Sequence, residues 1–157
     1  MINCNLIDNC RVSKSNRRET LIDKIAKSKS KCLVENPNEI EYNVIEFENC
    51  VYQGNQHQAK KCDFGLETSN EIYYIELKGS DNNQGLKQLL STVENTKHCF
   101  MKPQDDKGKT KSKSLNSILI VTQIEKPQNL DKITLRNLAK LTGKNPTIEK
   151  GSYTIHI

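Results

Sequence analysis

The stretch KCDFGLETSNEIYYIELKG, residues 61–79, decides the fold of this 157-residue chain. Two runs of apolar and β-branched residues, 61–68 and 72–79, are separated by the polar turn Ser69-Asn70-Glu71, which predicts a β-hairpin. Strand alternation puts Ile72, Tyr74 and Glu76 on one face and the intervening residues on the other. The hairpin therefore brings the beginning of its first strand beside the end of its second.

Periodicity on both sides of this hairpin predicts alternating helices and strands. The expected elements are an amphipathic helix over 18–31, a strand over 41–52, a helix over 84–100 capped by Asp81 or Asn82, a central strand over 117–124, a helix over 132–141 and an edge-like strand over 152–157. This order predicts an α/β fold with a mixed central sheet flanked by helices. We expect one domain over 1–157, with a core at about 18–124 and a C-terminal extension over 130–157.

Asp63, Glu76 and Lys78 carry the chemistry that the hairpin suggests. Glu76 and Lys78 are two residues apart and share a face, and Asp63 lies beside them if it takes the same face. Paired carboxylates repel one another unless a cation lies between them, and hard oxygen ligands favour Mg²⁺ or Mn²⁺. Such a set fits phosphodiester hydrolysis. The competing interpretation is an ordinary exposed ion pair on a strand.

These residues resemble the PD-(D/E)xK nuclease superfamily, through Lys61-Cys62-Asp63-Phe64-Gly65-Leu66 and Ile72-Tyr73-Tyr74-Ile75-Glu76-Leu77-Lys78-Gly79 followed by a glutamine-bearing helix. The element order resembles that superfamily's αβββαβ core, which is restriction-endonuclease-like or Holliday-junction-resolvase-like. Cys62 stands where a proline often precedes the first acid.

The resemblance implies roles for single residues. Asp63 and Glu76 would be metal ligands, with the main-chain carbonyl of Leu77 between them, and Lys78 would be the catalytic lysine. A glutamate completes the site in many members; Glu19 on the predicted first helix is the best match, with Glu46 and Glu48 as alternatives. Gln88 resembles a helix glutamine that some branches place near the lysine. Position 92 is Thr where such branches have Tyr, which argues against the RecB-like branch.

The distribution of charge is compatible with a polyanionic partner. The chain carries a net charge of +5, and residues 11–31 hold eight basic side chains against two acidic ones. A second basic segment, 102–113, reads as a long surface loop. We expect backbone phosphates of DNA to be contacted by residues of these segments: Arg17, Arg18, Lys24, Lys27, Lys107, Lys109 and Lys111. Solvated surface lysines explain the same charge equally well.

The six cysteines and the apolar runs indicate in which cellular compartment the protein is expected. The first residues, MINCNLIDNC, lack the features of a secretory signal, and the longest apolar run, 118–121, is too short for a membrane span. We therefore expect a cytoplasmic protein with free thiols, most of them buried. A zinc site built from Cys4, Cys10, His98 and Cys99 has a spacing unlike that of common zinc fingers.

Together these features predict a Mg²⁺- or Mn²⁺-dependent deoxyribonuclease, an endonuclease of structure-selective, repair or restriction type. The alternative is a nuclease fold that binds nucleic acid or protein without cutting. A single domain that cuts both strands often acts as a homodimer, so a dimer is also expected.

Overall fold

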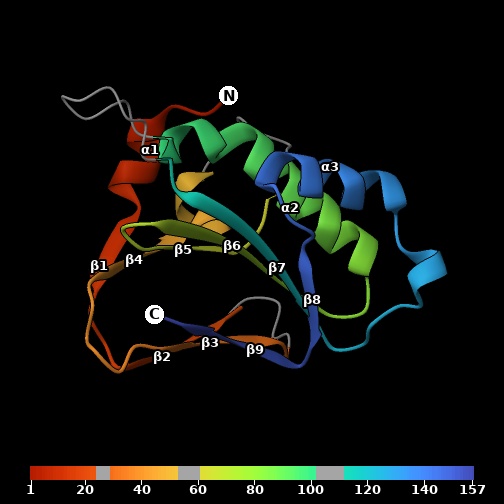
Figure 1. The fold of residues 1–157 in the computed structure, drawn as a ribbon, viewed down its shortest axis with the longest axis horizontal. Helices are drawn as coiled ribbons and strands as arrows, with labels where there is room; N and C mark the ends of the chain where they lie inside the picture. The colour runs from red at the N-terminus through yellow and green to blue at the C-terminus, as the bar shows by residue number, and fades with distance from the viewer. Residues whose placement is uncertain (24–28, 53–60, 102–111) are drawn as a thin grey trace.

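The computed structural model describes residues 1–23, 29–52, 61–101 and 112–157, and it has a three-layer architecture. A six-stranded sheet forms the middle layer, helices α2 and α3 cover one face, and a smaller three-stranded sheet lies against the other face (Figure 1). The fold is thus mixed α/β, as the sequence predicts. Among the described residues, no helix is both long and apolar enough to cross a membrane.

The middle sheet has the strand order β1-β4-β5-β6-β7-β8. Its strands are β1 (Arg11–Lys14), β4 (Tyr42–Glu46), β5 (Phe64–Glu67), β6 (Glu71–Lys78), β7 (Ser114–Val121) and β8 (Thr147–Lys150). β1, β4, β5 and β6 pair antiparallel, whereas β6, β7 and β8 run parallel. The mixed sheet with β7 as an inner strand is confirmed.

The smaller sheet has the order β2-β3-β9, with β2 (Arg18–Ile22) antiparallel and β9 (Ser152–His156) parallel to β3 (Lys31–Glu35). The remaining elements are the helices α1 (Cys4–Asn9), α2 (Asn82–Thr96) and α3 (Lys132–Thr142), the π-helix η1 (Phe47–Val51), and the 3₁₀ turns η2 (Lys97–Phe100) and η3 (Pro127–Asn129). Asp81 caps α2 by accepting a hydrogen bond from the Gln84 amide.

The hairpin prediction is confirmed, and its two faces bury different cores. Phe64 pairs with Ile75, and the same register sets Asp63 opposite Glu76. Ile72 and Tyr74 pack with α2, whereas Ile75 and Leu77 pack toward the smaller sheet. Both faces are apolar because each is covered by another layer.

The helix predicted over residues 18–31 is wrong. Residues 18–22 form β2 and residues 31–35 form β3, while 24–28 lie outside the described residues. Leu21 fits a helical stripe, but it also fits the inward face of a strand, and there it is buried between the sheets. Pairing with β3 decides the outcome, because tertiary contacts override a weak helical pattern.

The strand expected over 41–52 ends early. β4 stops at Glu46, and the chain then turns into the π-helix η1. Phe47 stacks on Tyr74 at a centroid distance of 5.6 Å, and its amide donates to the carbonyl of Asp63. These contacts hold η1 next to the segment that carries Asp63.

The expectation of six free thiols is also wrong. Cys4 is disulfide-bonded to Cys99, and Cys10 to Cys50, because α1 packs between η1 and η2. Cys32 and Cys62 are buried thiols, as expected for small core residues. Burial raises the pKa of Cys32 to about 12, so this thiol stays protonated at neutral pH.

Gly85 allows α2 to lie directly on β6 and β7. A Cβ at this position would approach Leu119 Cδ1 to 2.5 Å and Glu76 Cγ to 3.5 Å. Gly85→Ala is therefore expected to lower the free energy of unfolding by about 1–2 kcal/mol, although alanine has the better helix propensity. Urea unfolding measures this change. Gly79→Ala is the control, since a Cβ there meets nothing within 4 Å. Equal unfolding midpoints for the two variants would contradict this packing role.

Candidate active site

Asp63 and Glu76 lie side by side where β5 begins and β6 ends. The Asp63 amide donates to Glu76 Oε2 at 3.1 Å, and the Leu77 amide donates to Asp63 Oδ2 at 2.8 Å. Glu76 is 1% exposed and Asp63 7% exposed. Each carboxylate is thus held by the main chain of the opposite strand, which fixes the pair.

Lys78 joins this pair from the end of β6. Its Nζ lies 3.7 Å from Glu76 Oε1 and donates to Gln88 Oε1 at 2.7 Å. Gln88 Nε2 in turn donates to the carbonyl of Lys61 at 2.7 Å. Gln88 therefore links α2, the lysine and the segment before Asp63, which agrees with its predicted place beside the lysine.

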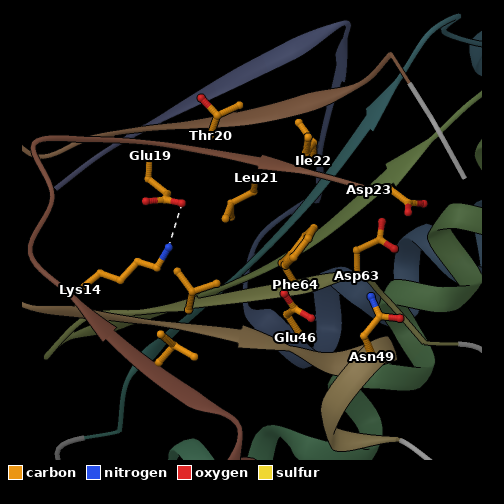
Figure 2. A pocket seen from close by; sticks show the side chains of 12 residues that line it. Lys14, Glu19, Thr20, Leu21, Ile22, Asp23, Glu46, Asn49, Asp63 and Phe64 are labelled. Carbon is orange, nitrogen blue, oxygen red and sulfur yellow. Dashed lines mark hydrogen bonds and ion pairs between the residues drawn. The ribbon is translucent and has the colours of Figure 1, made fainter. Parts of the chain in front are cut away.

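Two further carboxylates reach the same place. A pocket of about 270 Å³ is lined by Asp23, Glu48, Asp63, Glu76, Leu77, Lys78, Gly79 and Gln88. Figure 2 shows Asp23, at the end of β2, pointing toward Asp63. Glu48, on η1, lines the same pocket, and its charge acts on Asp63. We refer to Asp23, Glu48, Asp63 and Glu76 as the carboxylate cluster.

The two buried members of the carboxylate cluster, Asp63 and Glu76, have raised pKa values. Burial raises the pKa of Asp63 to about 7; the Leu77 amide opposes this rise, and the charges of Asp23 and Glu48 add to it. Burial and the neighbouring Asp63 charge hold the pKa of Glu76 well above its ordinary value, against the pull of Lys78. A cation placed among these oxygens would reverse both shifts.

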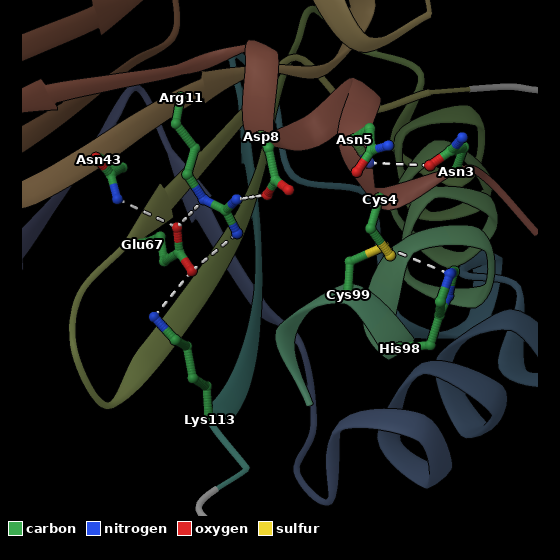
Figure 3. A network of polar contacts seen from close by, with 10 residues as sticks. All are labelled: Asn3, Cys4, Asn5, Asp8, Arg11, Asn43, Glu67, His98, Cys99 and Lys113. Atoms are coloured by element: carbon green, nitrogen blue, oxygen red, sulfur yellow. Dashed lines mark hydrogen bonds and ion pairs between the residues drawn. A yellow bond between two sulfur atoms is a disulfide. The ribbon is translucent and has the colours of Figure 1, made fainter. Parts of the chain in front are cut away.

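Glu67, at the other end of β5, provides a contrast. It is also buried, yet Arg11 Nε lies 2.6 Å and Lys113 Nζ 2.8 Å from its oxygens (Figure 3). Burial alone would raise its pKa, but these two cations hold the pKa below its ordinary value. Glu67 therefore has its positive partners built into the fold, whereas among the ion pairs of the described residues Glu76 has Lys78 alone and Asp63 has none.

The structure separates Glu19 from the carboxylate cluster. Glu19 forms an ion pair with Lys14 at 2.8 Å and accepts a hydrogen bond from Asn16 at 2.8 Å. Figure 2 shows this pair at the opposite end of β2 from Asp23. Of the three glutamates considered, Glu48 is the one brought to Asp63, while Glu46 and Glu19 line a neighbouring cleft.

That cleft runs between the two sheets and is called the inter-sheet cleft below. Its volume is about 400 Å³, and its lining residues are Val12, Lys14, Glu19, Thr20, Leu21, Ile22, Asp23, Val44, Glu46, Asn49, Asp63 and Phe64 (Figure 2). Asp23 and Asp63 line both this cleft and the smaller pocket. The two spaces therefore meet at these carboxylates.

The predicted phosphate-contacting residues are divided by the structure. Arg17 and Arg18 are exposed at the far end of β2 from Asp23, and Arg17 is paired with Glu39 at 3.1 Å. Lys24, Lys27, Lys107, Lys109 and Lys111 lie outside the described residues. Contacts of these five lysines with phosphate remain a prediction of the sequence.

Sequence reasoning missed Asp23, Ser30 and Thr92. Ser30 Oγ donates to the Lys78 carbonyl at 2.9 Å, and Thr92 Oγ1 accepts from the Cys62 amide at 2.8 Å, so both fix the main chain beside the site. The Thr92 hydroxyl thus holds the segment that carries Asp63. No pattern in the sequence indicates a role for Asp23, because Asp23 reaches the site only when residues 18–22 form the strand β2.

Cys4, His98 and Cys99 form a separate group whose potential ligand atoms lie within 4.8 Å of one another. Both sulfurs are used in the Cys4–Cys99 disulfide, which Figure 3 shows beside His98. His98 Nε2 lies 3.1 Å from the carbonyl of Ile2. Cys10, the remaining residue of the considered zinc set, is bonded to Cys50. The disulfide and the His98 contact thus attach the N-terminal segment to η2.

Comparisons with models of protein families, with curated proteins and with solved structures find no match for this chain. The geometry and chemistry of the site are therefore the basis for assigning a function.

Proposed function

We propose that the protein is a metal-dependent nuclease that hydrolyses phosphodiester bonds of DNA, with the site chemistry of the PD-(D/E)xK superfamily. The observation that carries this proposal is the convergence of two buried carboxylates with Lys78 at one end of the hairpin. Burial of like charges is costly, and a divalent cation offsets that cost most directly.

The arrangement of elements supports a restriction-endonuclease-like core. Strands β4, β5 and β6, helix α2 and strand β7 follow one another as βββαβ, with Asp63 directly before the second strand and Glu76 on the third. The helix that opens the family core has no counterpart at 18–31, where β2 and β3 form instead. The smaller sheet then supplies Asp23 as the additional acid.

The donor set suits Mg²⁺ or Mn²⁺. Asp63 and Glu76 would hold the ion, with Glu48 and Asp23 as further carboxylates and the Leu77 carbonyl as the neutral ligand that the resemblance implies. When bound, the ion would lower the pKa of a coordinated water and neutralise charge on a phosphoryl oxygen.

Lys78 would contact the substrate, and Gln88 would position Lys78. The Lys78 ammonium is oriented by Gln88 Oε1 and is less exposed than a free surface lysine, with a side chain 23% accessible. From this position it can donate to a scissile phosphate oxygen or orient the attacking water. Gln88 acts as the positioning residue, since both ends of its amide are engaged within the protein.

Lys78→Ala tests the proposal directly. We expect it to lower the rate of Mg²⁺- or Mn²⁺-dependent DNA cleavage by about 100-fold or more while leaving DNA binding within a few-fold, because a donor that acts on developing charge is lost. Cleavage is measured on supercoiled, linear, single-stranded and branched DNA. Lys140→Ala, on the exposed face of α3, is the matched control.

Equal cleavage by the wild type and Lys78→Ala would overturn the assignment of Lys78. Absence of metal-dependent cleavage on every DNA form would favour the second candidate, a nuclease fold that only binds nucleic acid or protein. Whether the enzyme acts as a homodimer is measured in the same samples by light scattering.

A further inference from the structure

We propose that the inter-sheet cleft binds one nucleoside of the substrate and that it favours a base carrying an exocyclic amino group. This inference deepens the proposed nuclease function and rests on it. It starts from the shared boundary of the two spaces: Asp63 and Asp23 line both the cleft and the pocket of the carboxylate cluster. A phosphodiester bound at Asp63 therefore places an adjoining nucleoside beside the cleft.

The cleft has the size and walls of a small-molecule site. Its volume of about 400 Å³ falls within the range of ligand pockets, which are apolar with a few placed polar groups. Leu21, Val44 and Phe64 form its apolar part, all of them buried between the sheets. The flat faces of a nucleobase can pack on such a surface.

The acidic lining of the cleft repels phosphate but not an uncharged nucleobase. Besides Asp23 and Asp63, which it shares with the pocket of the carboxylate cluster, the lining includes the carboxylates Glu19 and Glu46, and its cation Lys14 is paired with Glu19 at 2.8 Å. Phosphate would be repelled from this lining. An exocyclic amino group, in contrast, donates well to a carboxylate, the pairing by which acidic side chains recognise cytosine.

The entrance lies where both sheets end. β1 and β2 are terminal strands of their sheets, and Val12 on β1 lines the cleft while being 55% exposed. Glu46 and Asn49 are exposed on the neighbouring wall. A nucleoside can therefore enter from solvent when its base is unpaired, which predicts a preference for single-stranded or unstacked nucleotides over an intact duplex.

The test uses deoxynucleosides, which lack phosphate, in metal-free buffer, so that binding does not depend on catalysis. Saturation-transfer NMR should detect deoxycytidine and deoxyadenosine binding to the wild-type protein, with thymidine at least fivefold weaker. Val12→Trp fills the entrance from an exposed position and should weaken deoxycytidine binding at least tenfold. Ile133→Trp, 72% exposed on α3, is the control and should stay within twofold. Glu46→Gln should reduce the preference over thymidine.

Several outcomes distinguish this proposal from the nuclease assignment. If no deoxynucleoside binds, or if Val12→Trp binds as well as the wild type, the cleft proposal is wrong even where metal-dependent cleavage is observed. Saturable, Val12→Trp-sensitive binding without any cleavage supports the cleft and overturns only the nuclease assignment. Equal binding of thymidine and deoxycytidine overturns the amino-group preference.

Discussion

Asp63→Asn is expected to lower metal-dependent cleavage by about 1,000-fold or more and, at the same time, to stabilise the metal-free protein at pH 8. The first effect follows because a neutral amide is a poor ligand for Mg²⁺. The second follows because Asp63 is buried with a pKa raised to about 7 from 3.8, so its ionisation at pH 8 costs folding free energy. Asparagine keeps an acceptor for the Leu77 amide.

The sign of the pH dependence can be worked out. Between about pH 4 and pH 7 the folded metal-free protein binds a proton at Asp63 that the unfolded chain has released, so stability falls as the pH rises. The loss is complete above the folded pKa. Removing the charge should recover about 2–4 kcal/mol at pH 8, equivalent to about 5–10 °C in Tm.

Thermal unfolding in EDTA at pH 5 and pH 8, together with a cleavage assay, measures both effects. Glu149→Gln, an exposed carboxylate on β8, serves as the matched control and should change neither quantity. A variant that is inactive and also less stable than the wild type at pH 8 would indicate that Asp63 supports the fold rather than a metal site.

Adding Mn²⁺ or Mg²⁺ is expected to raise the Tm of the wild-type protein, and to do so more at pH 8 than at pH 6. A metal ion at 100 times its Kd stabilises the folded state by about 2.7 kcal/mol, or about 5–10 °C for a chain of this size. The pH dependence follows because Asp63 and Glu76 must lose protons that their raised pKa values retain at low pH.

Differential scanning fluorimetry with and without Mn²⁺ measures this shift, and calorimetry in buffers of different ionisation enthalpy measures the protons released. Asp63→Asn should lose most of the metal-induced shift, whereas Glu149→Gln should retain it. A wild-type protein whose Tm is the same with and without metal at pH 8 would favour the non-catalytic alternative.

The hairpin and the convergence of its polar side chains could be predicted because they are local. Asp63, Glu76 and Lys78 are set by strand alternation and one tight turn, and the register that joins them needs no distant partner. Gln88 follows from the next helix, which begins directly after the strand. Apolar runs with clear periods, such as β7 and α3, were found for the same reason.

The rest of the site depends on contacts that are distant in sequence. Glu48 reaches Asp63 because η1 interrupts the expected strand, and Asp23 does so because residues 18–22 pair with β3. Leu21 satisfies a helical stripe and a strand equally well, so the sequence pattern could not distinguish them. Glu19 would face the site only if residues 18–31 formed a helix, and in the strand it is instead paired with Lys14.

The Cys4–Cys99 disulfide has a consequence for the integrity of the molecule. It joins residues separated by 95 positions, an interval that contains Glu48, Asp63, Glu76 and Lys78. A single cut of the main chain anywhere within that interval leaves two fragments that remain covalently attached. On a denaturing gel, a nicked molecule would therefore migrate as one species without reductant and as two species with reductant. Its two fragments would also stay at a high effective concentration for reassembly.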